Sequence, residues 1–418
     1  MSRQTNDPMG GPAGGTMMTP RPSVAARLLL LFVVLACFGG ALYLVFRKGQ
    51  TSGGPGGSPQ AEQPSQPAGG PRRVALGVAY GTEKRTWLEA AAREFMNTPQ
   101  GRDIDVRLTG MGSLEAAQKV WEGKDRSVHV WSPASEIYTD VFVTEWRAKH
   151  GADPILHRER LALTPMVFVM REDRYQPFAK KYGGVTFKAI AQALGEETGW
   201  RAIADQPDWG FFRFSHTHPN KSNSGLMTLF LMAHDYFDKP SHLGGAELTR
   251  ADFQKYLRTI ESNAASQMGQ LVDSTGNLMV DMVRFGPSRY DCVFVYESTA
   301  IDQLRQAEGR WGKLRVVYPK YNMWSDNPYY VLDVPWSGPE HREAARKFLA
   351  YLLSEPVQQR ALDHGFRPAN VAVPTNGPNS PLVQFRANGL RTDLPGRECA
   401  APRAEVINGL LHRWQQIR

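Results

Sequence analysis

Small and hydroxyl-bearing residues gather in three short turns in the first third of the chain. The turns lie at 80–84 (YGTEK), 110–113 (GMGS) and 131–135 (WSPAS). Glycine lets a bound molecule approach the backbone closely, and the first N–H groups of a helix have no partner within that helix. Such turns can therefore bind an anion or a polar group through hydrogen bonds. The candidate binding residues in these turns are Thr82, Glu83, Lys84, Gly112, Ser113, Ser132 and Ala134.

The same hydroxyl residues also have a purely structural explanation. Serine and threonine are preferred N-cap residues, so each turn taken alone could simply begin a helix. The coincidence of three such turns with a polar loop further along the chain favours binding, and both explanations stay open.

That polar loop lies at 216–226 (HTHPNKSNSGL) and begins another predicted helix. His216 and His218 could give two nitrogens to a metal, but no cysteine or third histidine is near in sequence, so no metal site is predicted. The binding candidates in the loop are Thr217, Ser222 and Ser224.

Three further candidates lie at the ends of apolar segments. Tyr296 closes a predicted strand, where its hydroxyl could bind a ligand, and Glu297 follows at a helix start, where the helix dipole alone favours a carboxylate. Thr164 precedes Pro165, which interrupts a strand at 161–170 and suggests that the chain crosses there between two parts of the fold.

Enzyme motifs are missing from the sequence. It contains no G-x-S-x-G, H-E-x-x-H, Walker or G-x-G-x-x-G motif. The net charge of +8 is spread along the chain without a basic stripe, which argues against nucleic-acid binding but suits a protein near an anionic bilayer. We therefore expect no catalytic residue, cofactor or metal.

The elements that must position the three turns alternate regularly. Apolar strands are predicted at 74–79, 104–108 and 128–131, and amphipathic helices at 83–96 and 114–121. Strand, turn and helix in this order predict a parallel sheet, and the turns then meet at the carboxyl edge of its strands.

An apolar segment of 19 residues at 28–46 precedes this body and spans about 29 Å as a helix, enough to cross a bilayer. We predict an uncleaved anchor at 24–48, after a disordered segment at 1–23. A cleaved signal peptide and a lipoprotein cut before Cys37 are the alternatives. A Gly/Pro-rich linker at 49–73 follows and would tether the body. The secreted-type body downstream favours a single-pass cell-membrane anchor with the N-terminus in the cytoplasm and the body on the periplasmic or extracellular side.

Two cysteines, Cys292 and Cys399, lie in the body. In an exported protein they could form a disulfide, or they could be unrelated buried residues. The sequence leaves both readings open.

Taken in series, several segments make the chain resemble a family. It is similar to bacterial extracellular solute-binding proteins of the type II periplasmic-binding fold, in the group related to molybdate and other oxyanion binders. Within that group it resembles the branch whose members often carry a von Willebrand A domain after the binding domain. The segments are 80–84, 163–170, 217–226, 274–291 (STGNLMVDMVRFGPSRYD), 296–301 and 365–370 (GFRPAN).

The resemblance implies an α/β fold of two lobes, each a mainly parallel sheet flanked by helices, joined by two crossing strands. Lobe 1 would comprise 74–165 and 300–375, lobe 2 would comprise 166–299, and 376–418 would be a C-terminal extension with a helix. The implied ligand contacts are Thr82, Ser113, Ser132, Ser222, Ser224 and Tyr296.

The function implied is capture of a small polar or anionic solute between the lobes, for an ABC permease or a sensor partner. A scaffold of the cell envelope that kept the fold without the ligand is the alternative, and an enzyme on this fold is a further one.

Overall fold

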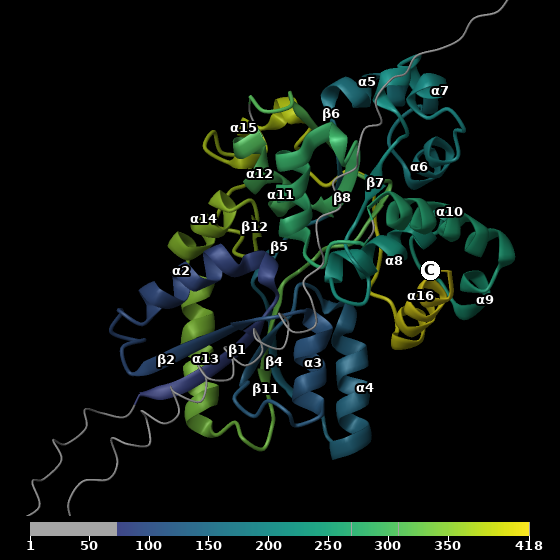
Figure 1. The fold of residues 1–418 in the computed structure, drawn as a ribbon. Helices are drawn as coiled ribbons and strands as arrows, with labels where there is room; N and C mark the ends of the chain where they lie inside the picture. Colours follow the sequence, from purple (N-terminus) through teal and green to yellow (C-terminus); the bar gives the residue numbers. More distant parts are fainter. Residues whose placement is uncertain (1–72, 269, 308, 418) are drawn as a thin grey trace, which may run out of the picture. The chain divides into compact units, whose positions relative to one another are not determined.

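The computed structural model describes residues 73–268, 270–307 and 309–417 (Figure 1). The predicted segments at 1–23 and 24–48, and the linker up to residue 72, lie outside the described residues. Within the described ranges, no helix combines the length and the apolar character needed to cross a membrane.

The first sheet has the strand order β2-β1-β3-β11-β4. β1 pairs in parallel with both β2 and β3, which confirms the parallel sheet predicted for the first third of the chain. β11 returns from the second lobe and runs antiparallel to its neighbours β3 and β4. The strands are β1 (Val74–Tyr80), β2 (Ile104–Gly110), β3 (Val130–Ser132), β4 (Ile155–Arg160) and β11 (Pro328–Leu332).

Helices cover both faces of this sheet because side chains alternate along each strand. Leu76 and Val78 of β1 pack with Phe348 in one apolar cluster, whereas Ala79 packs in another with Phe142. The helices of this lobe are α2 (Arg85–Phe95), α3 (Ser113–Trp121), α4 (Thr139–His150), α13 (Pro339–Leu352) and α14 (Glu355–Asp363), with the 3-10 turns η1 (Thr82–Lys84) and η2 (Glu136–Tyr138).

The second sheet has the order β7-β8-β6-β9. In this sheet β7 and β8 pair in parallel. The other two pairs, β6 with β8 and β6 with β9, are antiparallel, since β6 runs away from the junction between the sheets and β8 and β9 run towards it. The prediction of a mainly parallel sheet in each lobe is therefore wrong for this lobe. The strands are β6 (Met166–Arg171), β7 (Phe214–Ser215), β8 (Cys292–Tyr296) and β9 (Leu314–Val317).

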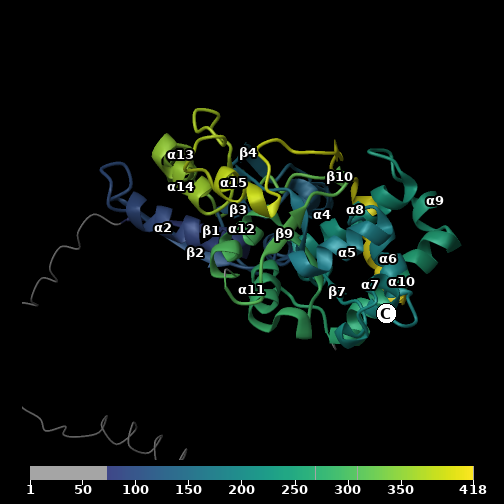
Figure 2. The ribbon, with the colours of Figure 1, turned by 90° about the horizontal axis from the view of Figure 1, so that it is seen from above.

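Helices again flank this sheet, and Figure 2 shows α8, α9 and α10 at the end of the body away from α2, α13 and α14. The helices are α5 (Glu172–Tyr182), α6 (Phe187–Leu194), α7 (Trp200–Ala204), α8 (Asn223–Phe237), α9 (Gly245–Leu248), α10 (Ala251–Met268), α11 (Thr275–Phe285) and α12 (Glu297–Ala307), with the 3-10 turns η3 (Pro207–Trp209) and η4 (Gly286–Ser288).

Two segments cross between the sheets. The first, 161–165, contains β5 (Ala162–Leu163) and breaks at Thr164-Pro165 as expected. The second, 318–327, contains β10 (Tyr321–Asn322), and an isolated antiparallel bridge joins Thr164 to Ser325 of this second crossing. β5 also pairs with β12 (Arg367–Pro368).

The second crossing lies later in the chain than the boundary drawn at residue 300. β9 pairs with β6 of the second sheet, and α12 packs against β8, so neither belongs to lobe 1 as drawn. The apolar run at 314–317 (LRVV) fits a strand of either sheet, so its residues alone do not indicate which sheet it joins.

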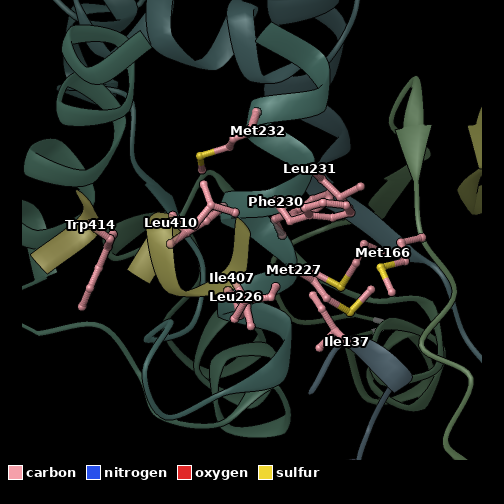
Figure 3. Packing of buried hydrophobic residues seen from close by; sticks show 14 of the residues in the cluster. Ile137, Met166, Leu226, Met227, Phe230, Leu231, Met232, Ile407, Leu410 and Trp414 are labelled. Atoms are coloured by element: carbon pink, nitrogen blue, oxygen red, sulfur yellow. The ribbon is translucent and has the colours of Figure 1, made fainter. Parts of the chain in front are cut away.

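The C-terminal extension reaches from the first lobe to the second. It contains α15 (Pro381–Gln384), η5 (Arg386–Asn388), β13 (Arg397–Glu398) and α16 (Ala404–Ile417). β13 pairs in parallel with β10 of the second crossing. Figure 3 shows Ile407 and Leu410 of α16 beside Leu226 and Met232 of α8, all within one buried cluster. Cys292 and Cys399 are both buried and free, so the disulfide left open by the sequence is not formed.

Asp326, in the second crossing, should make the stability depend on pH. Its side chain is 2% exposed, and burial, with the Glu136 charge nearby, raises its pKa to about 6. In the unfolded chain the pKa of an aspartate is about 4. The native state therefore binds a proton more readily between these values, and this contribution to stability is lost as pH rises from about 4 to about 6.

The variant D326N keeps an oxygen that can accept from the Glu136 N–H, now at 2.9 Å. Relative to wild type, we expect it to gain up to about 3 kcal/mol in unfolding free energy between pH 4 and pH 7, measured by urea denaturation. D103N, which changes an exposed aspartate, should show no such trend. Parallel pH profiles for D326N and wild type would refute the assignment.

Candidate functional site

A cavity of about 720 Å³ lies between the two lobes, beyond the carboxyl ends of β1 and β2. This volume is typical of sites for small organic molecules. The first lobe lines it with 81–83 and 111–115, and the second with 220–223, 273–277 and 298–299. Six of the predicted residues line the cavity together: Thr82, Glu83, Gly112, Ser113, Ser222 and Tyr296.

Two of the helices that begin at the cavity have no side-chain cap. α3 begins after Gly112 and α8 begins after Ser222, and neither residue caps its helix through a side chain. The Ser222 hydroxyl contacts the Ser224 hydroxyl at 3.0 Å instead. The N-terminal ends of both helices therefore keep N–H groups and positive partial charge at the cavity, which favours an anionic group there.

Ser113 does not cap its helix either. Its hydroxyl oxygen accepts the Ala134 N–H at 3.0 Å and so joins the second and third turns of the first lobe. Structural capping alone therefore does not explain Ser113 or Ser222. It does explain Ser135, whose oxygen accepts the Ile137 N–H, and Ser274, whose oxygen accepts the Asn277 N–H.

The lobes meet at the back of the cavity. Ser135 of the first lobe donates to Asn223 Oδ1 at 3.0 Å, and Asn223 Nδ2 donates to the Tyr296 hydroxyl at 2.7 Å. Burial raises the pKa of Tyr296 well above its ordinary value, so the hydroxyl stays protonated at neutral pH. At Gly112 a Cβ atom would lie 3.1 Å from the Lys221 carbonyl oxygen, which shows how closely the two walls approach.

Lys84 lies behind the lining rather than in it. The residue is 1% exposed. Its ammonium group donates to Glu83 Oε1 at 2.8 Å, to Pro133 O at 3.1 Å and to Asn327 Oδ1 at 3.3 Å. Burial lowers its pKa, and the Glu83 carboxylate opposes that shift. Lys84 thus joins the first and third turns to the second crossing segment.

Other predicted residues also lie outside the lining. Thr217 contacts the Ser224 hydroxyl at 2.7 Å, and Ser224 contacts Thr275, so these two support the loop from behind. The Thr164 hydroxyl accepts the Ser298 N–H at 3.0 Å. Ser132 is fully buried, and its hydroxyl has no hydrogen-bond partner among the described residues. Ala134 supplies its N–H to Ser113.

Glu297 forms a buried ion pair instead of a ligand contact. Arg367 Nε and Nη2 donate to its two carboxylate oxygens, each at 2.8 Å, and Tyr318 donates a further hydrogen bond to Oε2. The helix-dipole explanation given by the sequence was incomplete, because Arg367 is 70 residues away in sequence and could not be foreseen as a partner.

His216 is a structural residue. It is fully buried, and its Nε2 lies 2.8 Å from Glu261 Oε1. Glu261 Oε2 in turn accepts the Trp414 indole N–H of α16 at 2.6 Å. In the described part of the chain, no three His, Cys, Asp or Glu side chains are grouped so that they could hold a metal ion.

The segment 273–277 lines the cavity although none of its residues was predicted to bind. Ser274 caps α11 at the cavity wall. Tyr138, His364 and Phe366 also line the cavity and were missed. No local pattern marks them, because each reaches the site only through the tertiary fold.

The charged side chains that line the cavity do not carry a net positive charge that would attract an anion. Four carboxylates line the cavity against the side chains of Arg85 and Lys221. Lys221 pairs with Asp273 at 2.9 Å, and Glu115 pairs with Lys119 at 2.8 Å. Binding of an anionic group would therefore rest on backbone N–H groups and hydroxyls. The carboxylates are Glu83, Glu115, Asp273 and Asp302.

A family model described as "Bacterial extracellular solute-binding protein" matches residues 76–367. No curated protein sequence matches the chain.

Solved structures match at low sequence identity. The sulfate-binding protein SubI from Mycobacterium tuberculosis is 16% identical, with a TM-score of 0.50 over 78% of this chain and 94% of its own. A periplasmic thiamin binding protein is 12% identical, with a TM-score of 0.54 over 84% and 98%. Iron-bound HitA from Pseudomonas aeruginosa is 14% identical, with a TM-score of 0.52 over 82% and 99%. These likenesses show the two-lobed periplasmic-binding fold.

Proposed function

The chain belongs to the bacterial extracellular solute-binding proteins, a family of binding proteins rather than enzymes, and on this premise we propose that it captures a small polar or anionic solute in the cavity between its lobes. The observation that carries the proposal is the convergence of the uncapped starts of α3 and α8 on one cavity. Delivery to an ABC permease, or a report to a sensor partner, completes the proposed role.

We further propose that the protein is of the type II, oxyanion-binder-related group and is anchored by its predicted N-terminal segment. A bare tetrahedral oxyanion would fill only a small part of a cavity of about 720 Å³. The cavity therefore also suits an organic molecule that carries an anionic group and hydroxyls. The named ligands of the similar structures, among them sulfate, thiamin, iron and raffinose, differ too widely to select one.

A thermal-unfolding screen of the full chain tests the proposal. The compounds are inorganic oxyanions, hydroxylated carboxylates, sugar phosphates, sugars and amino acids. A ligand at 100 times its Kd stabilises the native state by about 2.7 kcal/mol, which is readily seen as a rise in Tm. No shift with any compound class would favour the alternative, a scaffold that kept the fold without the ligand.

Two serine-to-alanine variants test whether Ser222 contacts the ligand, with the tightest-binding compound of that screen as the probe. Ser222 lines the cavity, whereas Ser132 is buried outside the lining. We expect S222A to weaken binding about 5- to 10-fold, the value of one hydrogen bond of about 1 kcal/mol. S132A should leave the Kd unchanged, as measured by titration calorimetry. An equal effect of both variants would speak against direct contact by Ser222.

A further inference from the structure

A second depression, of about 600 Å³, lies at the opposite end of the first lobe. We call it the basal groove. It is formed where α3 and α4 end and where the chain leaves β11 (Figure 1). Its residues are Trp121, Glu122, Gly123, Lys124, Arg126, Lys149, His150, Pro335 and Trp336.

Hydrogen bonds place the basal groove at the end of the sheet where β1 begins. β1 runs from Val74 to Tyr80, and Tyr80 is at the cavity end. Towards the other end, His129 Nδ1 accepts the Gly77 N–H at 3.0 Å, and the Trp336 indole donates to Val128 O at 2.9 Å. The groove is therefore remote from the ligand cavity and close to the point where the linker joins the body.

Aromatic walls and exposed cations characterise the groove. Trp121 and Trp336 are half-buried, and the ring of Trp336 meets that of Trp146 edge-on at 6.1 Å between centroids. Lys124, which is exposed, pairs with Glu122 at 2.6 Å. The described residues hold no ion-pair partner for the other exposed cations of the groove, Arg126 and Lys149.

Structural needs account for only part of this set of residues, since Trp121 and Trp336 each pack one side against the buried core and keep another side exposed. Lys149 and His150 end α4, where cations interact favourably with the helix dipole. That argument does not extend to Arg126, which lies in the loop before β3, or to two tryptophans left partly exposed beside it. Tryptophan with an adjacent cationic rim is typical of surfaces that contact lipid headgroups.

We propose that the basal groove binds the headgroups of anionic phospholipids and orients the body on the membrane with its ligand cavity facing away. The inference rests on the proposed membrane anchor. A linker of the composition of the 24 residues at 49–72 would reach roughly 27 Å as a flexible coil, so we expect the end of the body at which β1 begins to stay near the bilayer. Among the groove residues the three cations Lys124, Arg126 and Lys149 outnumber the one carboxylate, Glu122, and this excess of positive charge complements an anionic surface.

Hydrogen–deuterium exchange of the full chain in nanodiscs tests the inference. One set of discs contains phosphatidylcholine alone, and the other contains phosphatidylcholine with phosphatidylglycerol. We expect lower deuterium uptake at 122–127 and 147–151 in the anionic discs, and a loss of this protection at high salt because the charges are then screened. Equal uptake in both kinds of disc would overturn the proposal.

The variant R126E/K149E should lose the protection specific to anionic discs. Both side chains are exposed, so the fold should be retained. The control K255E/R258E makes the same change of charge on exposed residues of α10 in the second lobe and should keep the protection. Protection that persists in R126E/K149E would also overturn the proposal.

Failure of this inference can be told apart from failure of the receptor proposal. A chain that binds a screened compound but shows no lipid-dependent protection is a receptor without a lipid-binding groove. If anionic lipid protects the groove but no screened compound binds, the basal-groove proposal stands and the proposal of a solute receptor fails. A chain that does not enter nanodiscs lacks the anchor, and the groove proposal fails with it.

Discussion

Replacement of Arg367 by methionine should lower the free energy of unfolding by about 3–5 kcal/mol, the usual result when one partner of a buried ion pair is removed. Arg367 and Glu297 are 8% and 0% exposed in their side chains. The variant would leave the Glu297 carboxylate buried without its cation. It would also free the carbonyl oxygens of Thr392 and Arg391, which now accept from the guanidinium at 2.6 and 2.7 Å.

Urea denaturation measures this effect by linear extrapolation. R107M is the matched control, since Arg107 pairs with Asp105 at the same distance of 2.8 Å but with side chains 67% and 38% exposed. Exposed pairs of this kind contribute about 0–1 kcal/mol. If R367M and R107M lost similar amounts of stability, the Arg367 pair would not be a structural link between α12 and β12.

The second large effect concerns Ser113. The variant S113D places a carboxylate at the first residue of α3, where it lines the cavity and can still accept the Ala134 N–H. An acidic residue there suits the helix dipole, so folding should be unimpaired. For an anionic ligand, however, like charges brought together cost several kcal/mol, and we expect the affinity to fall by about 100-fold or more.

S113N is the neutral control of the same shape, and its Kd should stay within about 10-fold of wild type because it changes hydrogen bonding without adding charge. Titration calorimetry with the tightest anionic compound of the screen gives both values. Equal affinities for S113D and S113N would show that no anionic group of the ligand lies at the start of α3.

Local patterns in the sequence predicted the parts of this molecule that are built from neighbouring residues. The first three strands of the first lobe, and the helices that follow the first two of them, were predicted because side-chain periodicity and turn chemistry are local. The break at Thr164-Pro165 was predicted for the same reason, since proline cannot donate to a central ladder.

The errors concern partners that are distant in sequence. Glu297 and Arg367, or Lys84 and Asn327, meet only after both crossings have formed. The direction of β9 within its sheet likewise depends on where the chain re-enters the first lobe. Position at a helix start was not sufficient to predict a binding residue: Gly112, Ser113 and Ser222 line the cavity, whereas Lys84 and Glu297 hold such positions and bind other side chains. Thr217 and Ser224 contact each other.

The C-terminal extension is a third segment of the chain that connects the two lobes, in addition to the crossings at 161–165 and 318–327. It follows a first-lobe segment in which Ala369 N donates to Gln358 Oε1, it pairs with the second crossing through β13, and it ends on the second lobe with α16. Cys399 N also donates to Asn322 O at 2.7 Å. Any swing of one lobe against the other must therefore bend this strap as well. We therefore expect the C-terminal extension to resist separation of the lobes and to narrow the range over which the cavity can open.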